Sequence, residues 1–169
     1  MPALAAPKPK AAKRKKRRQA PRPESVEYIV AIDGWNWSYS LSLNADKHPI
    51  DPYNEYRHLR IDGRVLRPTG LKVDRIEVTL LPSVEMDHDK RKDAEPLALG
   101  SLSAHDDRIT GLISIPQDAL PPILQMLIAK EFRFLCMFGS QFRYRNARLR
   151  SFRLEMNMSE DDMPPAGDA

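Results

Sequence analysis

The most chemically distinctive segment of the chain is a run of six consecutive cations near its N-terminus. It consists of Lys13, Arg14, Lys15, Lys16, Arg17 and Arg18. Such a run attracts polyanions, because each phosphate that it neutralises releases a bound counterion. The run therefore predicts contact with nucleic acid, with an acidic protein surface, or with an anionic membrane, nucleic acid being favoured over lipid. The alternative is a tail that only keeps the protein in solution.

A second cationic stretch lies near the C-terminus and is interleaved with aromatic residues. Its cations are Arg143, Arg145, Arg148, Arg150 and Arg153. Aromatic rings that stack bases, beside cations that hold phosphates, allow a sheet to bind single-stranded nucleic acid. Because alternate residues of a strand face opposite ways, however, Phe142 and Tyr144 should point away from the arginines. We therefore expect an arginine-bearing solvent face above aromatic residues of the core, with Arg143, Arg145, Arg148 and Arg150 as secondary anion contacts.

Three other groupings suggest chemistry only weakly. Residues 85–89 place a histidine between carboxylates, yet neighbouring residues in a loop rarely converge on one metal ion. Residues 105–107 (His-Asp-Asp) are typical of a hairpin turn. Asp33 precedes a glycine and is also interpreted as a turn residue. The lone Cys136 lies in an apolar run and is interpreted as a buried core thiol.

The sequence has no Gly-x-Ser-x-Gly motif, no phosphate-binding glycine loop and no zinc-ligand spacing. We therefore assign no catalytic residue, no metal ligand and no cofactor, and a binding module is favoured over an enzyme.

The charges of the chain are unevenly distributed. Of its 27 basic and 23 acidic residues, residues 1–23 hold nine bases and no acid, and residues 159–169 hold four acids and no base. The remaining 18 bases and 19 acids nearly cancel. We expect a disordered basic tail over 1–24, a folded domain over 25–158 and a disordered acidic end over 159–169.

The clearest element that could position these groups is a strand over 35–44. Apolar side chains alternate there with serine and asparagine: Trp35, Trp37, Tyr39, Leu41 and Leu43. We interpret these five as a core face. A strand over 27–33 precedes them, and the Asp33-Gly34 pair predicts a hairpin turn between the two.

Further period-two segments predict strands over 56–67, 72–81, 97–104, 108–115, 131–138 and about 145–157. Gly139 should end the strand over 131–138, and Met156 should face inward in the last one. A helical stripe over 118–129 predicts one short helix with Asp118 as its N-cap. Seven or eight short strands and one helix predict an all-β domain, an antiparallel sandwich or a partly closed barrel.

The sequence thus favours a β domain that a basic arm tethers to a polyanion or an acidic surface. One alternative is direct single-stranded nucleic-acid recognition by the arginine and aromatic strand. Another is an enzyme or carbohydrate-binding domain whose site is assembled from distant loops. The apolar runs are too short for a transmembrane helix, and no secretory signal is present, so we expect a cytoplasmic protein.

Overall fold

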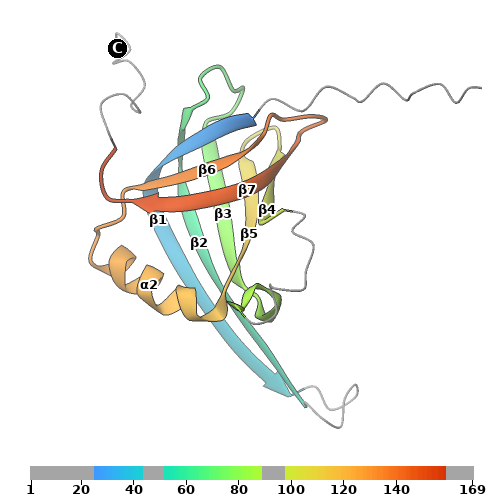
Figure 1. The fold of residues 1–169 in the computed structure, drawn as a ribbon, viewed down its shortest axis with the longest axis vertical. Helices are drawn as coiled ribbons and strands as arrows, with labels where there is room; N and C mark the ends of the chain where they lie inside the picture. The colour runs from blue at the N-terminus through green and yellow to red at the C-terminus, as the bar shows by residue number, and fades with distance from the viewer. Residues whose placement is uncertain (1–24, 44–51, 89–97, 159–169) are drawn as a thin grey trace, which may run out of the picture.

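The computed structural model describes residues 25–43, 52–88 and 98–158. Within them the chain is mostly β, with one short α-helix, as the sequence predicts. Figure 1 shows a strongly curved sheet with the helix α2 at one end. The expected basic tail, the acidic end and most of the charged loop over 83–95 lie outside the described residues.

Seven strands form a single sheet that closes on itself, so the barrel is the architecture adopted. The strands are β1 (Ser25–Leu43), β2 (Tyr53–Arg67), β3 (Arg75–Pro82), β4 (Gly100–Ala104), β5 (Ile109–Ile115), β6 (Phe134–Ser140) and β7 (Asn146–Glu155). Their order around the barrel is β1-β2-β3-β5-β4-β7-β6. The pairing of β3 with β5 is parallel, and the other pairings are antiparallel.

The expected hairpin at Asp33-Gly34 is wrong, because both segments belong to the 19-residue strand β1. The register with β2 shifts there, since Ile32 pairs with Gly63 and Gly34 pairs with Asp62. Asp33 is therefore the extra residue of a β-bulge. The bulge reverses the alternation, so the apolar residues before and after it lie on the same face.

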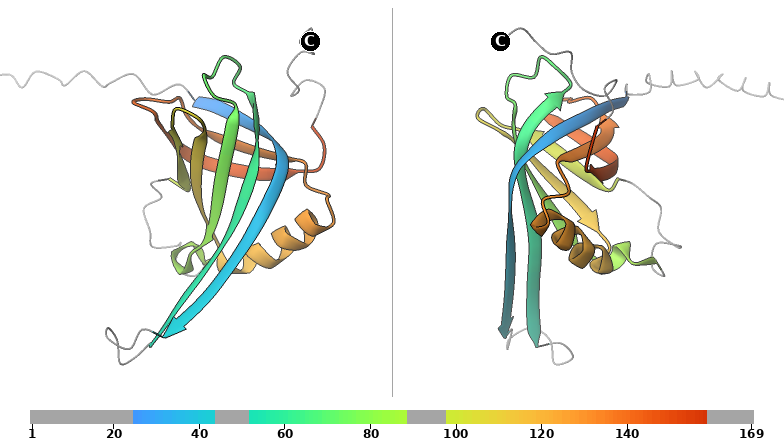
Figure 2. Two further views of the ribbon diagram at one scale, coloured as in Figure 1. Left: turned by 180° about the vertical axis from the view of Figure 1, so that it is seen from behind. Right: turned by 90° about the vertical axis from the view of Figure 1, so that its left-hand side faces the viewer.

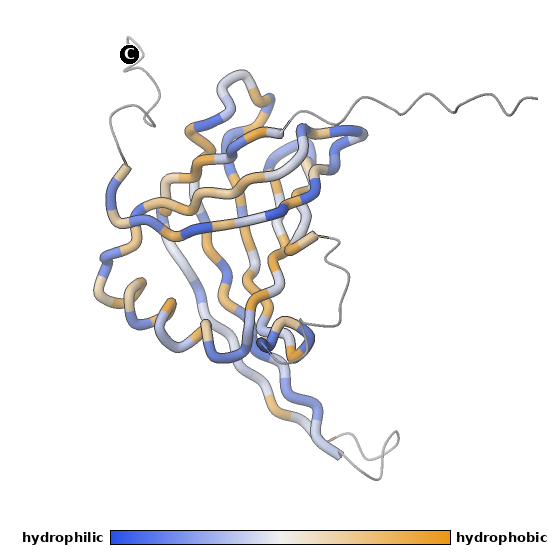
Figure 3. The backbone as a smooth tube through the Cα atoms, in the orientation of Figure 1, coloured by the Kyte–Doolittle hydropathy of each residue, from blue (hydrophilic) through white to orange (hydrophobic). Residues whose placement is uncertain are grey.

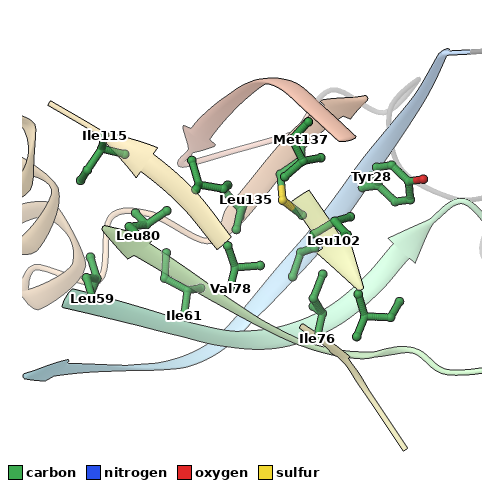
Figure 4. Packing of buried hydrophobic residues seen from close by; sticks show 14 of the residues in the cluster. Tyr28, Leu59, Ile61, Ile76, Val78, Leu80, Leu102, Ile115, Leu135 and Met137 are labelled. Atoms are coloured by element: carbon green, nitrogen blue, oxygen red, sulfur yellow. The ribbon is translucent and has the colours of Figure 1, made fainter. Parts of the chain in front are cut away.

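The core fills the barrel interior with aliphatic side chains from all seven strands and two from α2. Figure 4 shows the facing side chains of β2, β3, β5 and β6 converging between the strands. Fully buried examples are Leu59, Val78, Leu80, Ile113 and Leu135. No polar or charged side chain is buried among the described residues.

One end of the barrel carries the helix, which the sequence placed at 118–129. A 3-10 turn covers Gln117–Ala119, and α2 covers Leu120–Ile128. Asp118 lies in the 3-10 turn and is not the cap that we expected, because Ala119 occupies the N-cap position. Leu120 and Leu127 are buried against the strands.

The opposite end of the barrel, here called the open end, carries the loops between β2 and β3, between β4 and β5, and between β6 and β7 (Figure 2). Two predictions about β6 and β7 are wrong. Gly139 lies inside β6 instead of ending it, and Met156 follows the end of β7 and is exposed.

Candidate functional site

The arginine-rich stretch forms the tip of a β-hairpin at the open end of the barrel. Arg143 and Asn146 exchange backbone hydrogen bonds of 2.8 and 3.0 Å across a two-residue turn. The two turn residues, Tyr144 and Arg145, have φ angles of 50° and 67°. This left-handed geometry suits a hairpin turn but is usually filled by glycine, asparagine or aspartate.

The tyrosine at this tip contradicts the expectation that it faces the core. Tyr144 is 95% exposed, whereas Phe142 packs edge-on against Tyr28 with ring centroids 5.6 Å apart. Tyr144 therefore contributes nothing to the core, and it occupies a backbone conformation that costs a non-glycine residue free energy. An exposed aromatic ring between two arginines is instead suited to contact with a ligand.

Three of the four predicted arginines are exposed and form no ion pair with another described residue: Arg143, Arg148 and Arg150. The fourth, Arg145, contacts Asp106 through Nη2 and Oδ1 at 3.1 Å. Both of these side chains are largely exposed, so the ion pair contributes at most about 1 kcal/mol and is easily exchanged for another anion.

Strand β7 separates its arginines from its aromatic side chains as the alternation predicts. Ala147 and Leu149 are buried in the core, while Arg148 lies across from Ser101 of β4 on the outer face. A register shift beside Arg150 then restores an inward position for Phe152. The sheet face itself therefore carries cations without a row of stacking aromatics.

The hairpin also borders a hollow at the open end of the barrel. The hollow has a volume of about 350 Å³ and an apolar lining that includes Leu71, Ile109 and Phe142. Lys72, His105, Asp106 and Arg145 line its rim. His105 contacts the hydroxyl of Thr110 at 3.0 Å through Nε2. The mouth of a small β-barrel is a common ligand site, and this one combines an apolar floor with a mainly basic rim.

Sequence reasoning missed this hollow because its lining comes from three connections that are far apart in the chain. The sequence predicted the turn at 105–107, and the structure confirms it. The His105 N–H donates a hydrogen bond to the Arg108 carbonyl where the chain passes from β4 to β5. Nothing in the sequence indicated that this turn lies beside residues 71–73 and 142–145.

The chain enters the barrel at the same end. Ser25, the first residue of β1, pairs with Ser140, the last residue of β6. Figure 1 shows the start of β1 beside the hairpin of β6 and β7. The six consecutive cations at 13–18 lie outside the described residues, but they are covalently joined to this end of the barrel.

The remaining candidates are engaged in structural contacts. The carboxylate of Asp33 accepts two hydrogen bonds from Arg64, at 3.2 and 3.3 Å, and this contact raises the pKa of Arg64. Asp87 accepts a hydrogen bond of 3.1 Å from the backbone N–H of Gln117. Among the described residues, no three His, Cys, Asp or Glu side chains gather into a group that could hold a metal ion.

Cys136 is buried, as expected, although it lies on the outer side of the barrel wall. Its side chain is 2% exposed, and its thiol lies 3.6 Å from the sulfur of Met158. Burial raises the pKa of the Cys136 thiol, which keeps it in the unreactive protonated form.

Comparison of the chain with protein families, with curated proteins and with solved structures finds no match. In the described part of the chain, no helix has the length and apolar character needed to cross a membrane.

Proposed function

We propose that this protein is a non-enzymatic binding module that holds a polyanion, with nucleic acid favoured over an acidic protein surface. The run Lys13–Arg18 supplies most of the attraction, and the exposed arginines of the hairpin supply a second contact. The observation that carries this proposal is that β1, which follows the cationic run by six residues, begins beside the end of β6, where the arginine hairpin starts.

The covalent distance between the two groups supports a common ligand. Six residues separate the cationic run from Ser25, and a fully extended chain of that length spans about 25 Å at most. Ser25 pairs with Ser140, from which the hairpin begins. A nucleic-acid strand only a few nucleotides long can therefore contact the run and Arg143 at the same time.

The local charge supports the same assignment. The charges of residues 24–158 nearly cancel, yet the hairpin concentrates four arginines within eight residues. Three of them lack a described acidic partner. Binding a phosphate at these three arginines breaks no ion pair with a described residue, so their attraction is available to the ligand.

A second candidate function is direct recognition of single-stranded nucleic acid at the hairpin tip. The exposed ring of Tyr144, which follows Arg143 and precedes Arg145 in the turn, favours it. A base that stacks on such a ring gains about 1–3 kcal/mol. In this arrangement one aromatic side chain at the turn replaces the sheet-wide aromatic platform that the sequence suggested.

The test is fluorescence anisotropy with a labelled single-stranded oligonucleotide of about 20 nucleotides. The full chain is compared with a chain lacking residues 2–23 and with the variants Arg143→Gln and Tyr144→Ala. Arg133→Gln is the matched control, because it removes an exposed arginine just before the opposite end of β6.

We expect deletion of residues 2–23 to weaken binding at least about tenfold while the thermal melt stays unchanged. Arg143→Gln should weaken binding by a smaller factor, and Arg133→Gln should have little effect. If the deleted chain binds as tightly as the full chain, the basic run is not the binding element. If only Tyr144→Ala abolishes binding, the second candidate replaces the first.

A further inference from the structure

Strands β1 and β2 extend well beyond the barrel as a two-stranded ribbon. Residues 38–43 of β1 pair with residues 53–58 of β2, and within the described part of the chain neither segment pairs with another strand. Figures 1 and 2 show this ribbon projecting past α2, away from the loops at the open end. A lone two-stranded ribbon is marginally stable in water, so a surface that covers one of its faces would stabilise it.

The two faces of the ribbon differ sharply in polarity. One face, here called the ribbon face, is formed by Tyr39, Leu41, Leu43, Tyr53, Glu55 and Arg57. The other face is formed by Ser38, Ser40, Ser42, Asn54, Tyr56 and His58. Figure 3 colours the backbone by hydropathy and shows both hydrophobic and hydrophilic residues along the ribbon. Such two-sidedness is typical of a strand pair with one buried side.

The ribbon face continues the core-facing side of the barrel, but none of the described elements covers it. Trp37 packs against the core, and Trp35 beside α2 is already 37% exposed. Farther out, the exposed fractions rise to 54% for Tyr39, 55% for Leu41 and 68% for Leu43. The expectation that these residues form a core face is therefore wrong for the outer part of the strand.

The exposed apolar area is large for a chain of this size. Each apolar side chain of the ribbon face, together with Trp35, leaves about 100 Å² accessible, judged from the areas that such side chains bury. The patch therefore amounts to about 500 Å², which is in the upper part of the range that monomeric proteins expose.

The charges on the ribbon face are complementary to those of a second copy of the same face. Glu55 lies opposite Leu41, and Arg57 lies opposite Tyr39, so one acid and one base stand two residues apart among apolar side chains. Neither forms an ion pair with another described residue. When two such faces meet about a two-fold axis, Glu55 of each copy can oppose Arg57 of the other.

We propose that the ribbon face binds the ribbon face of a second copy of this chain. Two patches of about 500 Å² bury about 1,000 Å² in total, which is near the lower limit for a specific interface. We therefore expect a reversible dimer with a dissociation constant around micromolar. A lipid surface fits less well, because burying Glu55 and Arg57 without opposite charges costs several kcal/mol. The cationic run at 13–18 joins the barrel at the other end and is left free for its own ligand.

Sedimentation velocity of the full chain, over concentrations from about 1 to 200 µM, tests the dimer. Leu41→Lys should weaken association at least about tenfold, because it places an unpaired cation in the apolar patch. Ser42→Lys is the matched control, since the neighbouring residue carries the same new charge on the other face. Thermal melts of both variants should match the parent, because both positions are exposed.

A charge exchange distinguishes a second copy from any other partner. Glu55→Arg alone and Arg57→Glu alone should each weaken the dimer, because like charges then face each other across the axis. The double variant restores opposite charges and should regain dimer formation. A parent chain that stays monomeric at the highest concentration contradicts the proposal. Equal weakening by Leu41→Lys and Ser42→Lys, or no recovery in the double variant, also overturns it.

Discussion

Two glycines lie next to the bulge at Asp33, Gly34 in β1 and Gly63 in β2, and we expect their substitution by alanine to change stability in opposite directions. Gly63 lies in β2 directly across from the bulge, and a Cβ atom placed there would overlap the carbonyl oxygen of Ala31 and lie 2.7 Å from Val30 Cγ1. Gly34 lies in β1, and a Cβ atom there would meet nothing within 4 Å. Gly63→Ala and Gly34→Ala therefore add the same methyl group to two very different environments.

The expected magnitudes follow from these contacts. Ordinary Cβ contacts are 3.4–4 Å, so Gly63→Ala forces β1 and β2 apart where the register shifts. Overpacking of this kind costs about 1–3 kcal/mol. For a domain of this size each kcal/mol lowers the melting temperature by about 4 °C, so we expect a loss of about 4–12 °C. Gly34→Ala should raise stability by up to about 1 kcal/mol, because alanine restricts the unfolded chain.

Thermal melts and urea titrations followed by circular dichroism measure both variants against the parent. Equal denaturant slopes in the three proteins would show that the same domain unfolds in each case. If Gly63→Ala is as stable as the parent, the close approach of β2 to the bulge is not as described. If Gly34→Ala is the less stable of the two variants, the assignment of the bulge residue to β1 is wrong.

Three further predictions concern individual side chains of the barrel. Burial raises the pKa of Tyr28 to about 12 from its ordinary 10.0, so the folded state keeps this proton longer than the unfolded state. The free energy of unfolding should therefore fall as the pH rises from about 10 to 12, and urea titrations of Tyr28→Phe should lack that fall. At neutral pH the same variant should be about 1 kcal/mol less stable, because it loses the 2.7 Å hydrogen bond to the Ser140 carbonyl. Cys136 should react with a thiol reagent many times more slowly in the native protein than in urea, and equal rates would contradict its burial. Arg153→Gln breaks the 2.9 Å ion pair with Glu27 and should cost less than about 1 kcal/mol, with a smaller loss at high salt.

The strands and their apolar faces were predictable because side-chain alternation is a local property. The period of two placed Ile76, Val78 and Leu80 on one face, and all three are buried in the barrel. The closure of the sheet was not predictable, because it depends on the pairing of residue 25 with residue 140. No local pattern records a contact between residues so far apart in the chain.

The Asp33-Gly34 pair shows the limit of turn signals. The same two residues suit a tight hairpin turn and a β-bulge, and local preferences do not distinguish them. The choice is made by β2, whose residues 53–67 pair with residues 29–43 of β1 on both sides of the bulge. Alternation likewise identified the apolar side of residues 35–43 but could not indicate that nothing within the described chain covers Tyr39, Leu41 and Leu43.

The candidate site was predicted in its residue types and only partly in its geometry. Exposure of Arg148 followed from its alternation with the buried Ala147 and Leu149, whereas Arg143 and Arg145 are exposed because they lie at a turn. The reversal of the chain at Tyr144 did not, because hairpin turns of this type rarely use tyrosine and arginine.

The salt dependence of nucleic-acid binding tests the central proposal most directly. The logarithm of the affinity for a single-stranded oligonucleotide is measured against the logarithm of the salt concentration, for the full chain and for the chain lacking residues 2–23. Neutralising one phosphate with each of the six consecutive cations should make the slope of the full chain about 4 more negative than that of the deleted chain. The deleted chain should give a slope nearer to zero and a much lower affinity. Equal slopes for the two chains would show that residues 13–18 do not hold the polyanion.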